Sequence, residues 1–206
     1  MHHEAVQHLT RADRKLARII QQVGDCTLRP ARDRTLFHSL VVAVANQQLS
    51  GKAAATILGR FKAMFPGKRF PTPAQVLELP EEKLRTAGFS RAKSAAIRDI
   101  AAKALDGTIP SPRALARLKD EEIIERLISI RGVGQWTVEM LLIFKLGRAD
   151  VFPVTDLGIR KGFARLHGHD ELLPPKELMT HGESWRPYRS IASWYLWRSL
   201  DLTLAE

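Results

Sequence analysis

The hydrophobic positions along this 206-residue chain repeat at helical spacing almost throughout. Leu16, Ile19 and Ile20 fall on one face of a first helix. Thr10 and Asp13 precede this face, and either side chain is suited to cap the helix. No segment of useful length alternates between apolar and polar residues, as a half-buried strand would. The pattern therefore predicts an all-α protein with about ten short helices joined by short turns.

Capping residues predict where further helices begin. Ser50 and Ser90 each stand directly before a segment with helical periodicity, where a hydroxyl can cap the first turn. Acidic residues from Asp120 onward favour another helix start, and Gly107 is suited to end the helix that Ser90 begins. The expected helices cover 35–45, 51–65, 91–105 and 120–130.

Composition narrows the class of protein. The chain is 45% hydrophobic and 26% charged, which is typical of a globular protein with one domain or two small lobes. The longest apolar runs, 40–45 and 140–144, are far too short to cross a bilayer, and the N-terminus lacks the apolar region of a secretory signal. One cysteine, Cys26, excludes an intrachain disulfide and multi-cysteine metal sites, so we expect a reducing cytoplasm.

The charge balance suggests a partner. The chain has 32 Lys and Arg against 22 Asp and Glu, a net charge of +10. Such an excess suits a polyanion, and nucleic acid is the leading candidate. Charge alone does not choose between DNA, RNA and membrane lipid, and a simple basic surface is the plainest alternative.

A glycine-rich turn and a carboxylate stand close together in the segment 127–156. The glycines of Gly132-Val133-Gly134 permit positive φ and close backbone approach, while Val133 can fill the core between two helices. The turn also presents N–H groups at the start of a helix near Gln135, where a phosphate can bind. A plain helix–helix turn is the alternative. Asp156, taken alone, could simply be a helix cap.

A longer string makes the segment specific. The pattern "LxxIxGVGxWT" at 127–137 resembles the helix-hairpin-helix DNA glycosylase superfamily, in particular its alkylbase (3-methyladenine type II) branch. The likeness covers nearly the whole chain, through "ANQQLSGKAAATI", "LRTAGFSRAKSAAI", "VFPVTDLGI" and "SWRPYRSIASWYLWR". It implies two helical lobes with DNA bound in the cleft between them. The middle lobe would cover 36–148 and carry the hairpin, and the other would combine 1–35 with 149–206.

The resemblance implies a monofunctional DNA glycosylase that hydrolyses the N-glycosidic bond of alkylated bases in base-excision repair, with Asp156 as the catalytic carboxylate. Breaking a base–sugar bond passes through an oxocarbenium-like cation, which a nearby carboxylate stabilises. An alkylated purine that is already cationic leaves readily, so no second carboxylic acid is needed. The start of a helix is a favourable place for the charged carboxylate.

The resemblance also assigns a base pocket. Trp136 stands where strand-cutting relatives carry a lysine that forms a Schiff base, so no lyase activity is expected. Trp136 and Trp197 would stack on the flipped base, with cation–π attraction of about 1–2 kcal/mol when desolvated. Met140 and Leu157 would line the same pocket; they replace aromatic residues common in the family, which leaves the substrate range open. The alternative is that both tryptophans are core residues.

Further residues would contact DNA or an ion. The turn Gln47-Gln48-Leu49 would insert a wedge into the gap left by the flipped nucleotide, and Gln48 is preferred over Leu49. The hairpin contacts to DNA would come from Gly132, Val133, Gly134 and Thr137. The resemblance also implies a sodium or potassium ion held by the backbone carbonyls of Ile128, Ile130 and Val133. No other cofactor is expected.

Two alternatives to this function come from other classes. A non-catalytic helix-hairpin-helix protein would bind DNA only, and Asp156 argues against it. A bifunctional glycosylase-lyase for oxidised bases is disfavoured by Trp136. We expect a monomeric cytoplasmic enzyme, nucleoid-associated in a prokaryote, that acts on double-stranded DNA with alkylated bases and not at membranes. The order of preference among alkylated, etheno and deaminated bases stays open. His2 and His3 are expected in a flexible tail, without a role.

Overall fold

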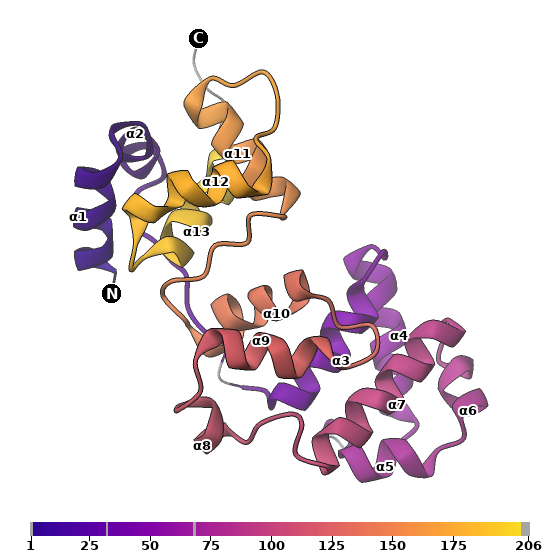
Figure 1. The fold of residues 1–206 in the computed structure, drawn as a ribbon. Helices are drawn as coiled ribbons and strands as arrows, with labels where there is room; N and C mark the ends of the chain where they lie inside the picture. The colour runs from indigo at the N-terminus through magenta and orange to yellow at the C-terminus, as the bar shows by residue number, and fades with distance from the viewer. Residues whose placement is uncertain (1, 32, 68, 203–206) are drawn as a thin grey trace. The chain divides into compact units, whose positions relative to one another are not determined.

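Helices account for all the regular secondary structure that the computed structural model describes, in residues 2–31, 33–67 and 69–202 (Figure 1). Thirteen α-helices, one π-helix and one short 3₁₀-helix follow one another along these ranges, without a strand. The predicted all-α fold is therefore confirmed. None of these helices has the length and apolar character needed to span a membrane.

The chain divides into two compact units. The middle unit covers 32–138, and the terminal unit combines 1–31 with 139–206. The sequence placed the corresponding boundary after residue 148, whereas this division falls inside α10 (Gln135–Leu141).

Backbone pairing explains why the segment after α10 belongs to the terminal unit. Ala31 N donates to Phe144 O at 2.8 Å, and Lys145 Nζ donates to Ala31 O at 2.7 Å. These bonds connect η1 (Leu142–Leu146), a π-helix, to the chain that follows α2. The sequence pattern could not show this, because the partners are far apart along the chain.

The middle unit is organised around α7 (Arg91–Leu105), whose Ile97 and Ile100 are fully buried. It packs against α3 (Leu36–Asn46), α5 (Pro73–Glu78) and α6 (Glu81–Thr86). The unit also contains α4 (Gly51–Ala63), α8 (Pro112–Leu115), α9 (Asp120–Ile128) and the start of α10. Phe61 of α4 is fully buried, and its ring contacts those of Phe65, Phe70 and Phe89. This apolar centre holds the unit together.

The terminal unit is organised around α13 (Arg189–Ser199), whose Ala192, Tyr195 and Leu196 are fully buried. It packs against α1 (His3–Ala12), α2 (Arg14–Val23), α11 (Leu157–His167) and η2 (Gly182–Trp185), a 3₁₀-helix. The remaining helix is α12 (Pro175–His181). Because α13 contacts helices from both ends of the chain, it joins the two segments of the unit.

Side-chain caps start several helices where the sequence indicated. Ser50 Oγ and Ser90 Oγ each accept an N–H bond of 3.3 Å from the third residue of the helix that follows. Asp13, and not Thr10, caps α2. Gly107 has a φ of +86° just beyond the end of α7. These predictions succeeded because a cap depends on residues within one turn.

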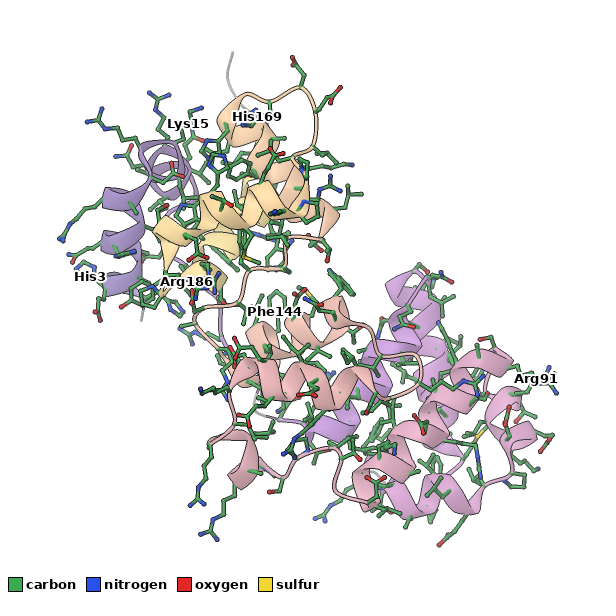
Figure 2. The ribbon with its side chains drawn as sticks, in the orientation of Figure 1. His3, Lys15, Arg91, Phe144, His169 and Arg186 are labelled. Atoms are coloured by element: carbon green, nitrogen blue, oxygen red, sulfur yellow. The ribbon has the colours of Figure 1, made fainter. Side chains whose placement is uncertain are left out.

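The positive charge lies at the surface. Of the lysines and arginines in the described ranges, only Arg189 is buried. Arg91, at the start of α7, extends away from the helices, and Lys15 of α2 is also exposed (Figure 2). The net charge of +10 is thus available to a polyanion.

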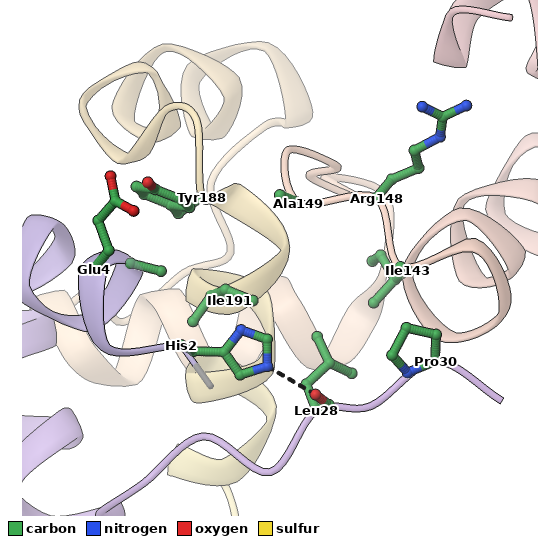
Figure 3. A pocket seen from close by; sticks show the side chains of 11 residues that line it. His2, Glu4, Leu28, Pro30, Ile143, Arg148, Ala149, Tyr188 and Ile191 are labelled. Atoms are coloured by element: carbon green, nitrogen blue, oxygen red, sulfur yellow. Dashed lines mark hydrogen bonds between the residues drawn. The ribbon is translucent and has the colours of Figure 1, made fainter. Parts of the chain in front are cut away.

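The expected tail at the N-terminus is wrong. His3 begins α1, and His2 Nε2 donates to Leu28 O at 2.8 Å. His2 and Leu28 line a small pocket in the terminal unit together with Pro30, Ile143 and other mainly apolar residues (Figure 3). The prediction failed because it considered the polarity of the two histidines but not the helical periodicity of the residues that follow them.

A half-buried carboxylate fixes the start of α2. Asp13 Oδ1 accepts from Lys15 N at 2.9 Å and Leu16 N at 3.0 Å. Its Oδ2 accepts from Trp185 Nε1 at 3.2 Å and lies 3.5 Å from His167 Nε2. Burial alone would raise the pKa of Asp13, but hydrogen bonding and charge from His167, with the two backbone N–H groups, lower the pKa to about 2. Asp13 is therefore a stabilising group of the terminal unit.

Candidate active site

The predicted hairpin is present in the middle unit. Helices α9 and α10 are joined by the turn 129–134, in which Gly132 has a φ of +77°. A Cβ at Gly132 would lie 3.0 Å from the Cβ of Ala96, so both the backbone angle and the close contact require glycine. Val133 is only 4% exposed, so its side chain belongs to the core. Gly134 is exposed with open space around it, so a ligand can approach its backbone closely.

The hairpin offers its backbone more than its side chains to a ligand. The N–H groups at the start of α10 suit a phosphate, as expected for a helix N-terminus. Thr137 is only 5% exposed, so its hydroxyl faces the interior in this structure. A DNA contact from Thr137, which the sequence predicted, would have to come from its backbone.

The cation site predicted at the backbone carbonyls of the hairpin stays a prediction. Ile130 O accepts from Val133 N at 3.1 Å, which leaves one lone pair of that carbonyl for a cation. Ile128 and Val133 supply the other two predicted ligands from the same segment. Carbonyl oxygens are ligands that suit a hard cation. In the described ranges, no group of three His, Cys, Asp or Glu side chains is placed to hold a metal ion.

The turn after α3 presents Gln48 at its tip. Leu49 N donates to Asn46 O at 3.2 Å, and Gln48 has a φ of +55°. Among the described residues other than glycine, Gln48 alone has a positive φ, a conformation that costs about 1–3 kcal/mol. Gln48 and Leu49 are exposed, whereas Gln47 is half-buried and its Nε2 donates to Gly132 O at 3.0 Å. The structure thus brings the predicted wedge turn against the hairpin.

The carboxylate singled out by the sequence lies in the terminal unit. Asp156 is the N-cap of α11, and its Oδ1 accepts from Ile159 N at 2.8 Å. The same oxygen accepts from the indole Nε1 of Trp197 at 2.9 Å. Asp156 is half-buried, so it is fixed in place without being closed off from solvent. The cap role and the catalytic role are therefore compatible in one side chain.

Trp197 has a role that the sequence did not indicate. Its ring centroid lies 5.5 Å from that of Phe144, at an interplanar angle of 30°. Phe144 is 40% exposed on η1 and is labelled in Figure 2. Trp197 thus combines an aromatic surface with a hydrogen bond that orients Asp156. The pairing joins residues 41 positions apart, and no local pattern reveals it.

Gly158 is a second residue that sequence reasoning missed. A Cβ there would lie 2.9 Å from Trp197 Cδ1, 3.0 Å from Asp156 Oδ1 and 3.1 Å from Trp197 Nε1. Any larger residue would push against the hydrogen bond between Asp156 and Trp197. The only signal in the sequence was a glycine in the first turn of a helix, where the backbone angles do not require glycine.

The remaining predicted pocket residues are placed as follows. Trp136 is 46% exposed in the middle unit, so it is not a core residue. Leu157 is 53% exposed at the start of α11, and Met140 is half-buried in α10. The core tryptophan of the protein is Trp185, at 1% exposure. Exposed aromatic surface is consistent with a stacking role for Trp136, and the assignment of all four pocket residues stays a prediction.

Helix α13 supports the loop that carries Asp156. Ser190 N donates to Ala149 O, and Val151 N donates to Ser190 Oγ, both at 2.9 Å. The buried guanidinium of Arg189 donates to Asp150 Oδ1 at 2.8 Å. The start of α13 therefore fixes the beginning of the loop, and Trp197, two turns along the same helix, fixes Asp156 at the loop's end.

Comparison with known proteins agrees with this arrangement. The family model described as "HhH-GPD superfamily base excision DNA repair protein" matches residues 41–187. DNA-3-methyladenine glycosylase 1 of Schizosaccharomyces pombe is 40% identical over 198 residues, which are 95% of this chain and 86% of the relative. The alkylbase DNA glycosidase-like protein mag2 of the same yeast is 35% identical, over 94% of this chain and 92% of its own.

Solved structures are similar along nearly the whole chain. The Schizosaccharomyces pombe 3-methyladenine DNA glycosylase Mag1, solved in complex with abasic DNA, has a TM-score of 0.83 at 40% identity and covers 97% of both chains. A DNA-3-methyladenine glycosidase from Bacillus halodurans has a TM-score of 0.85 at 35% identity and covers 94% of this chain and 88% of its own. The protein therefore belongs to the HhH-GPD superfamily of base excision DNA repair proteins.

Proposed function

We propose that the protein is a monofunctional DNA glycosylase that removes alkylated bases from double-stranded DNA and so begins base-excision repair. The observation that carries the proposal is the fixed carboxylate of Asp156, held by Ile159 N and Trp197 Nε1 at the N-terminus of α11. The names of two similar proteins, DNA-3-methyladenine glycosylase 1 and the alkylbase DNA glycosidase-like protein mag2, support the substrate class.

The carboxylate would act on charge that develops in the sugar. As the base leaves, positive charge accumulates on the anomeric carbon and ring oxygen, and a fixed negative group stabilises it without reorganising. Ile159 N and Trp197 Nε1 both donate to Oδ1 of Asp156. These two bonds fix the direction of the carboxylate. A carboxylate held in this way can also orient the attacking water.

The substrate's own charge explains why one carboxylate suffices. An N3- or N7-alkylated purine is cationic, so it departs without a general acid to protonate it. Trp136, 46% exposed at the start of α10, would stack on such an electron-poor ring. It also occupies the position at which a lysine would be needed for a Schiff base with the sugar. The product is therefore an intact abasic site.

The hairpin and the turn at 46–49 would supply the contacts with DNA. Backbone N–H groups near Gly132 and Gly134 would bind phosphates, and Gln48 would occupy the space vacated by the flipped nucleotide. Base flipping brings the damaged nucleotide to groups that a stacked base could not reach.

The test is an excision assay on a panel of duplexes that each contain one lesion. The panel holds 3-methyladenine, 7-methylguanine, ethenoadenine, hypoxanthine and an undamaged control, and reactions without enzyme measure spontaneous base loss. We expect release of at least one cationic alkylated base well above the reaction without enzyme, with strand cleavage only after alkali. Rates equal to those without enzyme for every lesion would refute the proposed function.

A further inference from the structure

One lysine of α7 binds the turn that carries Gln48. Lys93 Nζ donates to Ala45 O at 2.9 Å and to Gln47 O at 2.6 Å. Ala45 O belongs to the last turn of α3, where carbonyls lack partners within the helix and a cation is favourable. Gln47 O belongs to the peptide that joins Gln47 to Gln48. Lys93 therefore connects the end of α3 to the tip of the turn.

The bond to Gln47 O selects the conformation of this turn. Gln47 has φ −54° and ψ 129°, and Gln48 has φ +55°, as in a type II turn. Types I and II differ by a flip of the central peptide, which reverses the direction of its carbonyl. Type II favours glycine at the position of Gln48, so a glutamine there needs support. Lys93 supplies that support because it holds the carbonyl in the type II direction.

Helix α7 also positions the hairpin. The Cβ of Ala96 sets how closely Gly132 can approach, and Arg131 N donates to Asp99 Oδ2 at 2.7 Å. Lys93, Ala96 and Asp99 follow at three-residue spacing, so they succeed one another along one broad side of the helix. Both turns that would face DNA are thus set by the same rigid element.

The ammonium group of Lys93 is only partly accessible to water. The residue is half-buried, and burial lowers the pKa of its amine. The amide of Gln47 then links the turn to the hairpin through Gly132 O at 3.0 Å.

We propose that Lys93 is a positioning residue for damage recognition: it fixes the peptide between Gln47 and Gln48 so that the Gln48 side chain enters the gap left by the flipped nucleotide, in register with the hairpin. The proposal rests on the proposed glycosylase function. Lys93 acts through Gln48 and contacts no reacting atom.

The test compares two substrates with the same lesion. In one, hypoxanthine is paired in a duplex; in the other, it forms a one-nucleotide bulge without a partner base. A wedge is needed most where a base must be unpaired and unstacked. Lys93→Met should therefore lower the single-turnover excision rate about tenfold on the paired lesion, and should lower the rate on the bulged lesion much less. Lys93→Arg, which keeps the charge and donors, should recover most of the loss.

Lys103→Met is the matched control, because it removes one lysine charge from the same helix at a site where Nζ bonds the nearby Asp106 at 3.2 Å and not the turn that carries Gln48. It should leave the ratio of the two rates unchanged. Equal loss on both substrates with Lys93→Met, or wild-type excision from the paired lesion, would overturn the proposal. If Lys93→Met does not fold, Lys93→Gln, whose polar side chain is shorter and lacks the charge, should show the same substrate-selective defect.

Two further measurements separate this proposal from the proposed function. Fluorescence of 2-aminopurine beside an abasic-site analogue reports insertion of the wedge without any excision, and Lys93→Met should lose the increase that wild type gives on binding. The double variant with Gln48→Ala should be no worse than Gln48→Ala alone, because both act through one side chain. Additive losses would show that Lys93 acts elsewhere. If wild type excised no lesion, the proposed glycosylase function would be refuted. The fluorescence test would still decide whether Lys93 positions the turn that carries Gln48.

Discussion

Replacing Asp156 with asparagine separates the charge of the side chain from its structural contacts. The Oδ1 atom accepts bonds from Ile159 N at 2.8 Å and Trp197 Nε1 at 2.9 Å, and the amide oxygen of asparagine can accept both. Asparagine also caps a helix nearly as well as aspartate. The change therefore removes the negative charge and leaves the fold and the side-chain orientation in place.

Two free-energy costs show that Asp156→Asn should change the excision rate far more than the stability of the fold. Losing the charge at a helix N-terminus costs about 0.3–1 kcal/mol of stability, which lowers the melting temperature of a protein of this size by no more than about 4 °C. Losing one electrostatic partner of a transition state costs about 3–4 kcal/mol, in line with about 4 kcal/mol for unit charges 4 Å apart at an effective dielectric constant near 20. The excision rate of Asp156→Asn should therefore fall by roughly a hundred- to a thousandfold.

The assay is single-turnover excision of hypoxanthine from a duplex with enzyme in excess, alongside a binding titration and a melting curve. Hypoxanthine is a weak leaving group, so spontaneous loss does not hide the effect as it would for 7-methylguanine. Affinity for undamaged DNA should hold or rise, because a carboxylate near phosphates is removed. A variant that folds, binds and still excises hypoxanthine at the wild-type rate would show that Asp156 is only a helix cap.

The other predictions test different parts of the molecule. Gly158→Ala places a methyl group 2.9 Å from Trp197 Cδ1, so excision should fall about tenfold or more with little loss of binding; a wild-type rate would mean that the neighbours move aside freely. With Trp136 in place of a lysine, wild type should leave abasic sites that are not cut until alkali is added, and borohydride should trap no adduct; a trapped adduct would identify another amine as nucleophile. The logarithm of the binding constant for undamaged duplex should fall linearly with the logarithm of the salt concentration, with a slope steeper than about −3 if four or more phosphates are contacted. A binding constant that does not change with salt would contradict a role for the basic surface. The pKa of Asp13 is lowered from 3.8 to about 2, so the stabilisation from its carboxylate is present above pH 4 and is lost as pH falls toward 2. In urea unfolding, wild type should lose about 2 kcal/mol over this range relative to Asp13→Asn, which has no carboxylate to protonate, and parallel pH profiles would refute the lowered pKa.

Local signals predicted the helices and the hairpin well, because these features depend on residues within a turn or two. Ser50 and Ser90 cap the helices that they precede, and Gly132 has the positive φ that its turn requires. Asp156 was singled out through the resemblance to the glycosylase family, because a carboxylate at the start of a helix is by itself equally suited to be a cap. In each case the physical requirement is met by neighbours in the sequence.

Long-range contacts were not predictable in the same way. The bond from Trp197 to Asp156 and the contact that requires glycine at position 158 appear only once α11 and α13 are packed together. The assignment of residues 139–148 to the terminal unit depends on pairing with Ala31. A tryptophan in a helix indicates burial or stacking, but nothing in its neighbours shows which atom its N–H will reach.

Each compact unit has one buried helix that positions the groups proposed to act on DNA. In the middle unit, α7 fixes the wedge turn through Lys93 and the hairpin through Ala96 and Asp99. In the terminal unit, α13 fixes the loop that carries Asp156 through Ser190, and Asp156 itself through Trp197. Recognition of damage and stabilisation of the sugar cation would thus depend on different helices. Substitutions on α7 should therefore change how strongly excision depends on base pairing, whereas substitutions on α13 should slow paired and unpaired lesions alike, because the carboxylate is needed for either.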